Sequence, residues 1–198
     1  MRMPKPSNRD RILEAGLKVM VRKGYGAGVR DIVAEASAPQ GSFTNHFRSK
    51  EHFAREVLDL YFGDLKRLVA ETLGDATRSP RQRLRRYLDI ITDRLARAEF
   101  TRGCLIGDFS LEAAPQSEPL RARLAEIFAE WRAPFAACIA EGQGTGEIAA
   151  TFAPEDLADF LLSSWEGAIL RMKVERNAEP LERFKRVVFA TVFKEPSP

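Results

Sequence analysis

The sequence predicts an all-α fold with a three-helix, helix-turn-helix domain at residues 1–50 and a larger helical domain at residues 51–198. Two observations carry this prediction. Apolar residues recur at the three-to-four residue spacing of amphipathic helices nearly throughout, and alternating strand patterns bounded by turn residues are hard to find. Turn and capping residues divide the periodic segments into about nine helices.

The first expected helix spans about residues 8–23. Ser7 can cap it, and Asp10, three residues later, completes a capping box. Gly24 suits the position directly after the last helical residue. We expect its apolar stripe to comprise Leu13, Leu17, Met20 and Val21.

The next two expected helices are short, at about residues 29–36 and 39–46, and a very short turn at residues 37–38 separates them. Pro39 fits the first position of a helix, where its missing N–H costs nothing. Phe43 and Phe47 lie four residues apart and are expected to face inward. Two short helices joined in this way form a helix-turn-helix.

The remaining expected helices make up the larger domain. Ser49 is a suitable N-cap for the first of them, and Ser79-Pro80 opens the second. Pro134 is expected to kink or distort its helix, and Gly142, Gly144 and Gly146 are expected to form a break. The approximate ranges are 50–73, from 80 onward, 104–113, 118–141, 154–176 and 180–193.

Composition excludes several classes of protein. The 198 residues are 44% hydrophobic and 30% charged, which is typical of a globular chain. No apolar run approaches the roughly 18 residues of a membrane helix, and the N-terminus lacks an apolar signal stretch, so we expect a cytoplasmic protein with no membrane partner. Two cysteines, Cys104 and Cys138, cannot complete a disulfide framework or a zinc site by themselves. We expect neither a metal nor a cofactor.

The net charge of +3 is unevenly distributed. Residues 1–60 contain eleven Lys and Arg against seven Asp and Glu, whereas the remaining residues contain twenty against twenty-one. This asymmetry favours a polyanion-binding segment attached to a nearly neutral body.

Polar side chains are expected on the outer face of the helix-turn-helix. Gln and Asn can donate and accept together at an adenine edge, and a lysine in the first turn of the following helix suits a phosphate. For His46, the alternative is a surface position without any DNA contact. Tyr25 either touches a phosphate or simply packs against the end of the first helix. The candidate DNA contacts are Arg30, Gln40, Gly41, Ser42, Thr44, Asn45, His46 and Lys50.

Several motifs in register resemble one family. They are Arg11-Ile-Leu-Glu-Ala, Arg22-Lys-Gly-Tyr-Gly, Arg30-Asp-Ile-Val-Ala-Glu-Ala-Ser and Gln40-Gly-Ser-Phe-Thr-Asn-His-Phe-Arg-Ser-Lys-Glu, and over residues 8–55 they resemble the DNA-binding domain of TetR regulators. The resemblance implies an operator of double-stranded DNA, a homodimer and a small-molecule effector. The family commonly has Gly at the position of Ser37 and Tyr at that of Thr44, so DNA affinity is expected to differ.

Two further stretches resemble the NemR-like and AcuR-like branch of that family. They are Arg102-Gly-Cys-Leu-Ile-Gly-Asp-Phe-Ser-Leu-Glu and Ser164-Trp-Glu-Gly-Ala. The resemblance implies an effector that is a reactive electrophile or a small unsaturated acid. Cys104 opens a short helix near Arg102, where a thiolate would be favoured, although a small buried packing role is the alternative.

A ligand pocket is expected among the helices between residues 80 and 176. Its candidate residues are Phe100, Cys104, Phe109, Phe128, Trp131, Phe135 and Trp165. The last two helices carry apolar faces wider than one neighbour needs, which favours a homodimer through these helices, with burial inside a monomer as the alternative.

Together these features predict a transcriptional repressor that a small molecule releases from a pseudo-palindromic operator. A small helical enzyme is the alternative from another class. It is disfavoured because both histidines, His46 and His52, lie in the N-terminal segment, so no catalytic triad can be assembled in the body. The third hypothesis is a constitutive DNA-binding protein without an effector.

Overall fold

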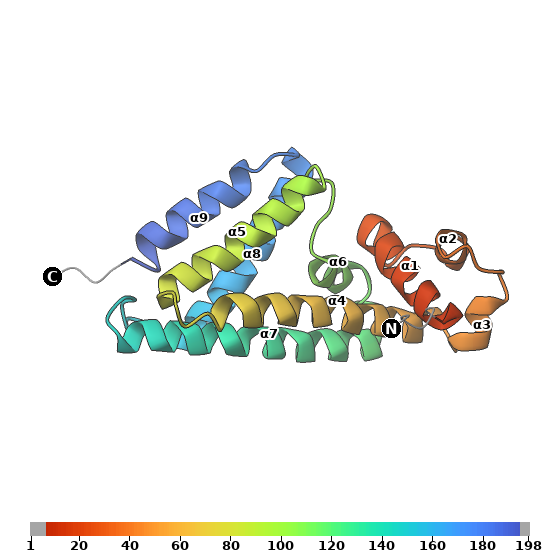
Figure 1. The fold of residues 1–198 in the computed structure, drawn as a ribbon, viewed down its shortest axis with the longest axis horizontal. Coiled ribbons are helices and arrows are strands. Elements are labelled where there is room, and N and C mark those ends of the chain that lie inside the picture. The colour runs from red at the N-terminus through yellow and green to blue at the C-terminus, as the bar shows by residue number, and fades with distance from the viewer. Residues whose placement is uncertain (1–6, 195–198) are drawn as a thin grey trace, which may run out of the picture. The chain divides into compact units, whose positions relative to one another are not determined.

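The computed structural model describes residues 7–194, and within that range the protein contains nine helices and no strand (Figure 1). This confirms the all-α prediction. Residues 1–6, on which the expected lack of a signal segment chiefly depends, lie outside the described residues. The helices are α1 (Asn8–Lys23), α2 (Val29–Glu35), α3 (Ser42–His46), α4 (Lys50–Leu73), α5 (Pro80–Arg97), α6 (Leu105–Glu112), α7 (Glu118–Gly144), α8 (Pro154–Glu175) and α9 (Glu179–Thr191).

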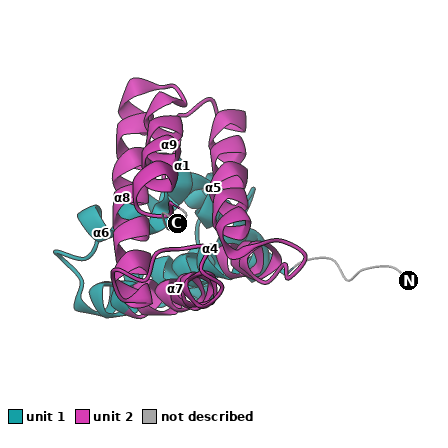
Figure 2. Cartoon of the chain, turned by 90° about the vertical axis from the view of Figure 1, so that its left-hand side faces the viewer, with its two compact units in different colours: residues 1–63, 104–125 teal, residues 64–103, 126–198 magenta. Residues whose placement is uncertain are grey.

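The chain divides into two compact units (Figure 2). The first comprises residues 1–63 and 104–125, and the second comprises residues 64–103 and 126–198. Helices α4 and α7 each contribute residues to both units. The segment containing α6 therefore packs with the N-terminal helices, although it follows them by more than 40 residues.

Helix α1 begins and ends as its capping residues predict. Ser7 Oγ accepts a hydrogen bond from Asp10 N–H at 3.1 Å, the Asp10 carboxylate accepts one from Ser7 N–H, and Gly24 follows the helix at a φ of 72°. The predicted stripe was only partly right, because Leu13, Leu17 and Val21 are half-buried. The face that packs inward comprises Ile12, Ala15, Gly16, Val19 and Met20.

Gly16 explains this rotation of the buried face. A Cβ atom at this position would lie 2.1 Å from the Phe53 ring, so only glycine lets the ring of α4 pack against the backbone of α1. Phe53 is fully buried. A close contact between the two helices thus depends on a residue that hydropathy alone does not identify.

The second helix of the helix-turn-helix is shorter than predicted, because it begins later in the chain. Ser37 adopts a φ of 49°, and α3 begins at Ser42 and not at Pro39. Ala38 N–H donates to Val33 O at 3.0 Å and Ser42 N–H donates to Pro39 O at 2.9 Å. These bonds hold residues 37–41 as consecutive turns, so Gln40 and Gly41 precede the helix.

Two boundaries in the second unit test the predicted capping and break residues. Ser79 and Pro80 open α5 as predicted, and Gln82 completes a capping box that was not predicted. Helix α7 continues past Pro134 to Gly144, so Gly142 does not end it as predicted, but the break follows directly and contains Gly146 at a φ of 75°. A Cβ atom at Gly142 would lie 2.7 Å from Ile148, which shows that this glycine makes room for the loop after the helix.

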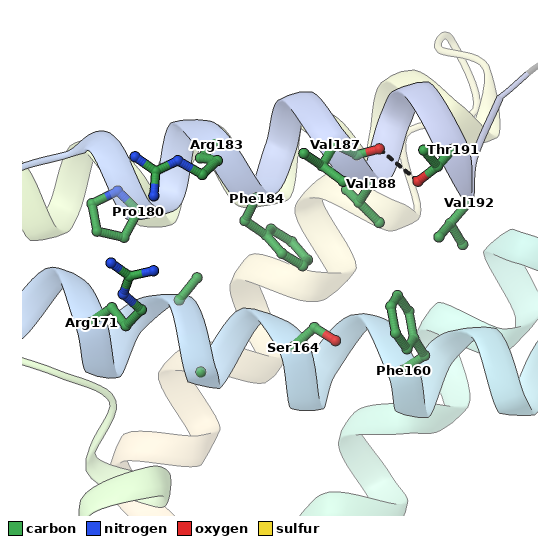
Figure 3. Close-up of a pocket in the computed structure, with 12 residues that line it drawn as sticks. Phe160, Ser164, Arg171, Pro180, Arg183, Phe184, Val187, Val188, Thr191 and Val192 are labelled. Carbon is green, nitrogen blue, oxygen red and sulfur yellow. Dashed lines mark hydrogen bonds between the residues drawn. The ribbon is translucent and has the colours of Figure 1, made fainter.

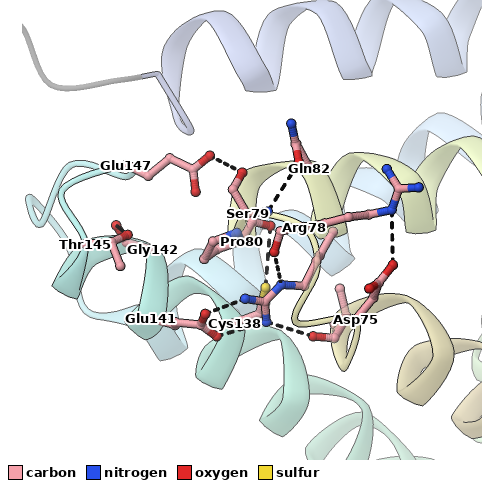
Figure 4. Close-up of polar contacts among 12 residues, drawn as sticks. Asp75, Arg78, Ser79, Pro80, Gln82, Cys138, Glu141, Gly142, Thr145 and Glu147 are labelled. Atoms are coloured by element: carbon pink, nitrogen blue, oxygen red, sulfur yellow. Dashed lines mark hydrogen bonds and ion pairs between the residues drawn. The ribbon is translucent and has the colours of Figure 1, made fainter.

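A buried arginine ties the end of α4 to α5 and α7. Arg83, 6% exposed, donates to Leu73 O at 3.1 Å, to Arg78 O at 2.9 Å and to Glu141 Oε2 at 2.9 Å. Hydrogen bonding to Arg83 lowers the pKa of Glu141. Figure 4 shows Glu141 and Cys138 on α7, facing Arg78 of the preceding loop and Pro80 at the start of α5. Through its hydrogen bond to Leu73 O, this arginine satisfies a carbonyl that the end of α4 leaves without a helical partner.

Among the described helices, none combines the length and the apolar character that crossing a membrane requires.

Candidate nucleic-acid interface and effector site

A cluster of three buried phenylalanines packs behind the outer face of the helix-turn-helix. Phe43 of α3 and Phe47, directly after α3, pack against Phe53 of α4, with ring centroids 5.0 and 4.7 Å from that ring. All three rings are buried, which confirms the predicted inward face. Because an aromatic cluster fixes the rotation of α3, the opposite side of this short helix faces solvent.

The candidate DNA contacts lie on α3, in the turn before it, on α2 (Arg30) and in the first turn of α4 (Lys50). Ser42 and Lys50 are half-buried. The other candidates are exposed, namely Arg30, Gln40, Gly41, Thr44, Asn45 and His46. Thr44 Oγ1 donates to Gly41 O at 3.0 Å, so its hydroxyl reinforces the start of α3. Donor and acceptor groups on an exposed short helix are the arrangement that base edges and phosphates require.

Lys50 lies in the first turn of α4 and stacks on an aromatic ring. Its Nζ is 4.8 Å from the centroid of the Tyr25 ring. Desolvation lowers the pKa of Lys50, and the charge of Glu112 opposes that shift. Ser49 caps the same helix through a 3.0 Å hydrogen bond from His52 N–H. The lysine is therefore held in one place, beside Tyr25 at the start of α4.

Two residues that position the interface were not predicted. Arg11 donates to Ala36 O at 2.7 Å and so joins α1 to the end of α2. Glu112, the last residue of α6, accepts a 2.7 Å hydrogen bond from Tyr25 N–H. Both contacts join residues distant in sequence, and no local pattern signals either of them.

The candidate effector residues divide between the two units. Cys104 and Phe109 belong to the first, where Cys104 is the N-cap residue of α6 and the Tyr61 hydroxyl donates to its Sγ at 3.8 Å. Cys104 is 7% exposed. Phe109 is buried and packs edge-on against Tyr25, with ring centroids 5.6 Å apart.

The second unit contains the other five candidates. Trp131, Phe135 and Trp165 are buried as expected for core or pocket residues. Phe128 is 37% exposed, so it does not share the buried environment of these three residues. Its ring stacks on that of Trp131, with ring centroids 6.4 Å apart. Phe100 is half-buried and adopts a φ of 54° directly after α5.

Trp131 carries a polar atom that lacks a partner. Its Nε1 is buried and has no hydrogen-bond acceptor among the described residues. A buried donor left unpaired costs about 1–3 kcal/mol. A buried donor of this kind is satisfied by an ordered water or by a bound molecule.

The two thiols differ in chemical environment. Burial raises the pKa of the Cys138 thiol to about 11, and its Sγ lies 3.5 Å from Pro80 O. The thiolate is the reactive form of cysteine, so Cys138 is unreactive near neutral pH.

An apolar groove runs between α8 and α9 in the second unit (Figure 3). Its volume is about 280 Å³, and its lining includes Phe160, Phe184, Val187, Val188 and Val192. Phe160 is 50% exposed and Val187 is 53% exposed, although both are large apolar residues. Clustered apolar side chains of this kind are typical of an interaction surface.

Comparison with known proteins agrees with this arrangement. Residues 12–57 match the family described as "Bacterial regulatory proteins, tetR family", and residues 80–188 match "Tetracyclin repressor-like, C-terminal domain". The HTH-type transcriptional repressor DhaR of Mycobacterium sp. (strain GP1) is 50% identical over 182 residues, which cover 91% of this chain and 90% of that protein.

Two further similarities extend along most of the chain. The transcriptional regulator AcuR of Cereibacter sphaeroides is 35% identical over 88% of this chain and 80% of its own length. A crystal structure of the regulatory protein TetR from Rhodobacter sphaeroides is 33% identical, with a TM-score of 0.89, and covers 93% of this chain and 98% of that one. The predicted resemblance is confirmed, and the chain belongs to the TetR family of bacterial transcriptional regulators.

Proposed function

We propose that the protein is a repressor that a small effector releases from a pseudo-palindromic DNA operator. The observation that carries the proposal is the exposed polar face of α3, held outward by the buried ring cluster of Phe43, Phe47 and Phe53. The similarity to the repressor DhaR supports the direction of regulation. The protein acts by binding and not by catalysis, and it acts in the cytoplasm, where bacterial operators are found.

The proposed division of labour follows the chain. Residues 1–50 bind DNA, and residues 51–198 bind the effector and a second copy of the protein. Asn45 and Gln40 read bases, whereas Lys50, Arg30 and the hydroxyls of Ser42 and Thr44 contact phosphates.

Replacing one base-reading and one phosphate-binding residue tests the DNA contacts. Asn45→Ala should reduce binding to the operator more than binding to unrelated DNA, by about tenfold, because a base contact contributes about 1–3 kcal/mol of discrimination. Lys50→Ala should weaken binding to all sequences alike and flatten the log–log salt dependence by about one unit. Fluorescence anisotropy across a salt series measures both effects.

The two variants also control for each other. Asn45 and Lys50 lie in adjacent helices, so general damage to the domain would affect operator and unrelated DNA equally in both variants. Equal losses on both DNAs for Asn45→Ala would remove it from base reading. An unchanged salt slope for Lys50→Ala would remove it from the phosphate contacts.

The groove between α8 and α9 supports the proposed homodimer. A second copy would place its own α8 and α9 against the exposed Phe160 and Val187 and form a four-helix interface. A two-fold interface of this type presents the same patch on both subunits. It also supplies the two reading helices that a pseudo-palindromic operator requires.

The effector that we propose is a small unsaturated acid or a related electrophile. Trp131 supports this choice because its buried indole N–H would donate to an acceptor oxygen of the effector. Cys104 supports it because it is the N-cap residue of α6, where the helix dipole favours a thiolate, whereas the pKa of the Cys138 thiol is raised to about 11. An electrophile would therefore modify Cys104.

A mobility shift on operator DNA with a panel of small acids and electrophiles tests this choice. Trp131→Phe should raise the concentration of acid that releases DNA by about tenfold, because the effector loses a hydrogen bond. Cys104→Ser should abolish release by electrophiles, while Cys138→Ser, the matched control, should respond as wild type does. Normal release of Cys104→Ser by every electrophile would leave this cysteine as a packing residue.

A further inference from the structure

The carboxylate of Glu112 reaches from the end of α6 to the turn between α1 and α2. Its Oε2 accepts a 2.7 Å hydrogen bond from Tyr25 N–H, across 87 residues of sequence. A Cβ atom at Gly24 would lie 2.3 Å from that same oxygen, and Gly24 has a φ of 72°. Gly24 therefore gives the turn its shape and also leaves the space that the carboxylate fills.

The hydrogen-bonded residue Tyr25 is also the platform for Lys50. The lysine Nζ stacks over the Tyr25 ring at 4.8 Å, so the backbone of Tyr25 binds the carboxylate while its ring binds the ammonium. The charge of Glu112 raises the pKa of Lys50 against the effect of desolvation. The acidic group thus stabilises the charged form of the proposed phosphate anchor.

The segment that follows α6 is anchored at its other end as well. Ser117, 7% exposed, donates to Glu51 Oε2 at 2.6 Å, and its Oγ also accepts a 3.3 Å hydrogen bond from Leu120 N–H. Glu51 lies in the first turn of α4, next to Lys50. Residues 112–117 are therefore fixed at both ends beside the start of α4.

From these contacts we propose that Glu112 is a positioning residue of the DNA interface with two opposed effects. Its hydrogen bond to Tyr25 holds the platform under Lys50, which favours DNA binding. Its negative charge competes with the DNA phosphate for Lys50, which weakens DNA binding. This inference rests on the proposed contact between Lys50 and phosphate.

Two substitutions separate the two effects. Glu112→Gln keeps an oxygen that accepts from Tyr25 N–H but removes the charge, so affinity for DNA should rise by about two- to fivefold at low salt. The gain should shrink as salt screens the charges. Glu112→Ala removes both the acceptor and the charge, so it should bind DNA more weakly than Glu112→Gln does.

The controls use the same anisotropy titrations on one operator and one unrelated DNA. Glu155→Gln, an exposed glutamate on α8, removes the same charge from the other unit and should leave affinity nearly unchanged. In a Lys50→Ala background, Glu112→Gln should have no further effect, because the competing cation is gone. Circular dichroism melting of each variant shows whether the helices remain folded.

Three results would count against the inference. If Glu112→Gln binds DNA no more tightly than Glu155→Gln, or gains as much in the Lys50→Ala background, the competition is overturned. If Glu112→Ala binds as tightly as Glu112→Gln, the hydrogen bond to Tyr25 has no positioning role. If Lys50→Ala itself binds DNA as wild type does, the phosphate anchor fails first and the inference fails with it.

Discussion

Ser37 lies in the turn of the helix-turn-helix with its backbone in the left-handed region. Its φ of 49° lies in the region that favours glycine, and the resembled family commonly has Gly there. Arg11 stabilises the same turn by donating to Ala36 O at 2.7 Å. The first feature is implied by the family resemblance, whereas the second depends on folding α1 against α2 and could not be predicted.

Replacing Ser37 with glycine should stabilise the protein. A non-glycine residue in the left-handed region costs about 1–2 kcal/mol, and part of that gain is lost to the greater entropy of glycine in the unfolded chain. We expect Ser37→Gly to raise the free energy of unfolding by about 0.5–1 kcal/mol in urea titrations.

The neighbouring residue provides the matched control. Ala36 has a φ of −75°, so Ala36→Gly should lower the free energy of unfolding. Equal effects of the two substitutions would show that backbone strain at Ser37 is not the cause.

At the candidate sites, the sequence predicted the burial of some side chains but not of others. The exposed polar residues of α3 and the inward Phe43 and Phe47 follow from helical periodicity, which confirms that face of the prediction. Phe128 shares a helix with the buried Trp131 and was expected to share its environment, but it is 37% exposed. Spacing along one helix cannot show how far the neighbouring helices extend over it.

Helix boundaries followed the sequence where a capping residue sets them and departed from it where packing sets them. Ser7, Ser49 and Ser79 cap their helices as predicted. The end of α7 lies beyond Gly142, and this glycine instead leaves room for Ile148 of the following loop. From the sequence alone, a glycine that allows close packing within a helix cannot be distinguished from a glycine that ends a helix.

The contact of α1 with α4 predicts opposite effects for two glycine substitutions. Gly16→Ala should destabilise the protein by about 1–3 kcal/mol, because the added methyl overlaps a fully buried Phe53 ring that two other rings hold in place. Gly63→Ala, within α4, should stabilise it by up to about 1 kcal/mol through helix propensity, since nothing lies within 4 Å of its new methyl group.

Thermal and urea unfolding of the two variants measure this difference. If Gly16→Ala proved as stable as Gly63→Ala, α1 and α4 would not be in close contact at Gly16.

For the whole molecule, the sequence predicted the helices and the family but not how the helices group. Residues 104–125 pack with the N-terminal helices, and this brings Glu112 to Tyr25. A charge count along the chain identified the basic N-terminal segment correctly, but it could not show that an acidic residue of the later segment lies beside Lys50.

A charged residue in the apolar groove should prevent dimerisation. Val187→Glu would bury an unpaired carboxylate at the proposed interface, at a cost of several kcal/mol, and should yield a monomer in sedimentation velocity where wild type is a dimer. Leu111→Glu, at a residue of α6 that is 68% exposed, is the control and should remain dimeric. A dimeric Val187→Glu would place the interface elsewhere.

Selection of binding sites from random double-stranded DNA tests the central claim most directly. A homodimer with two outward-facing α3 helices predicts enrichment of a pseudo-palindrome whose half-sites are centred about 34–36 Å, or a multiple of one DNA turn, apart. Enrichment of no sequence, or of a single half-site without symmetry, would contradict it.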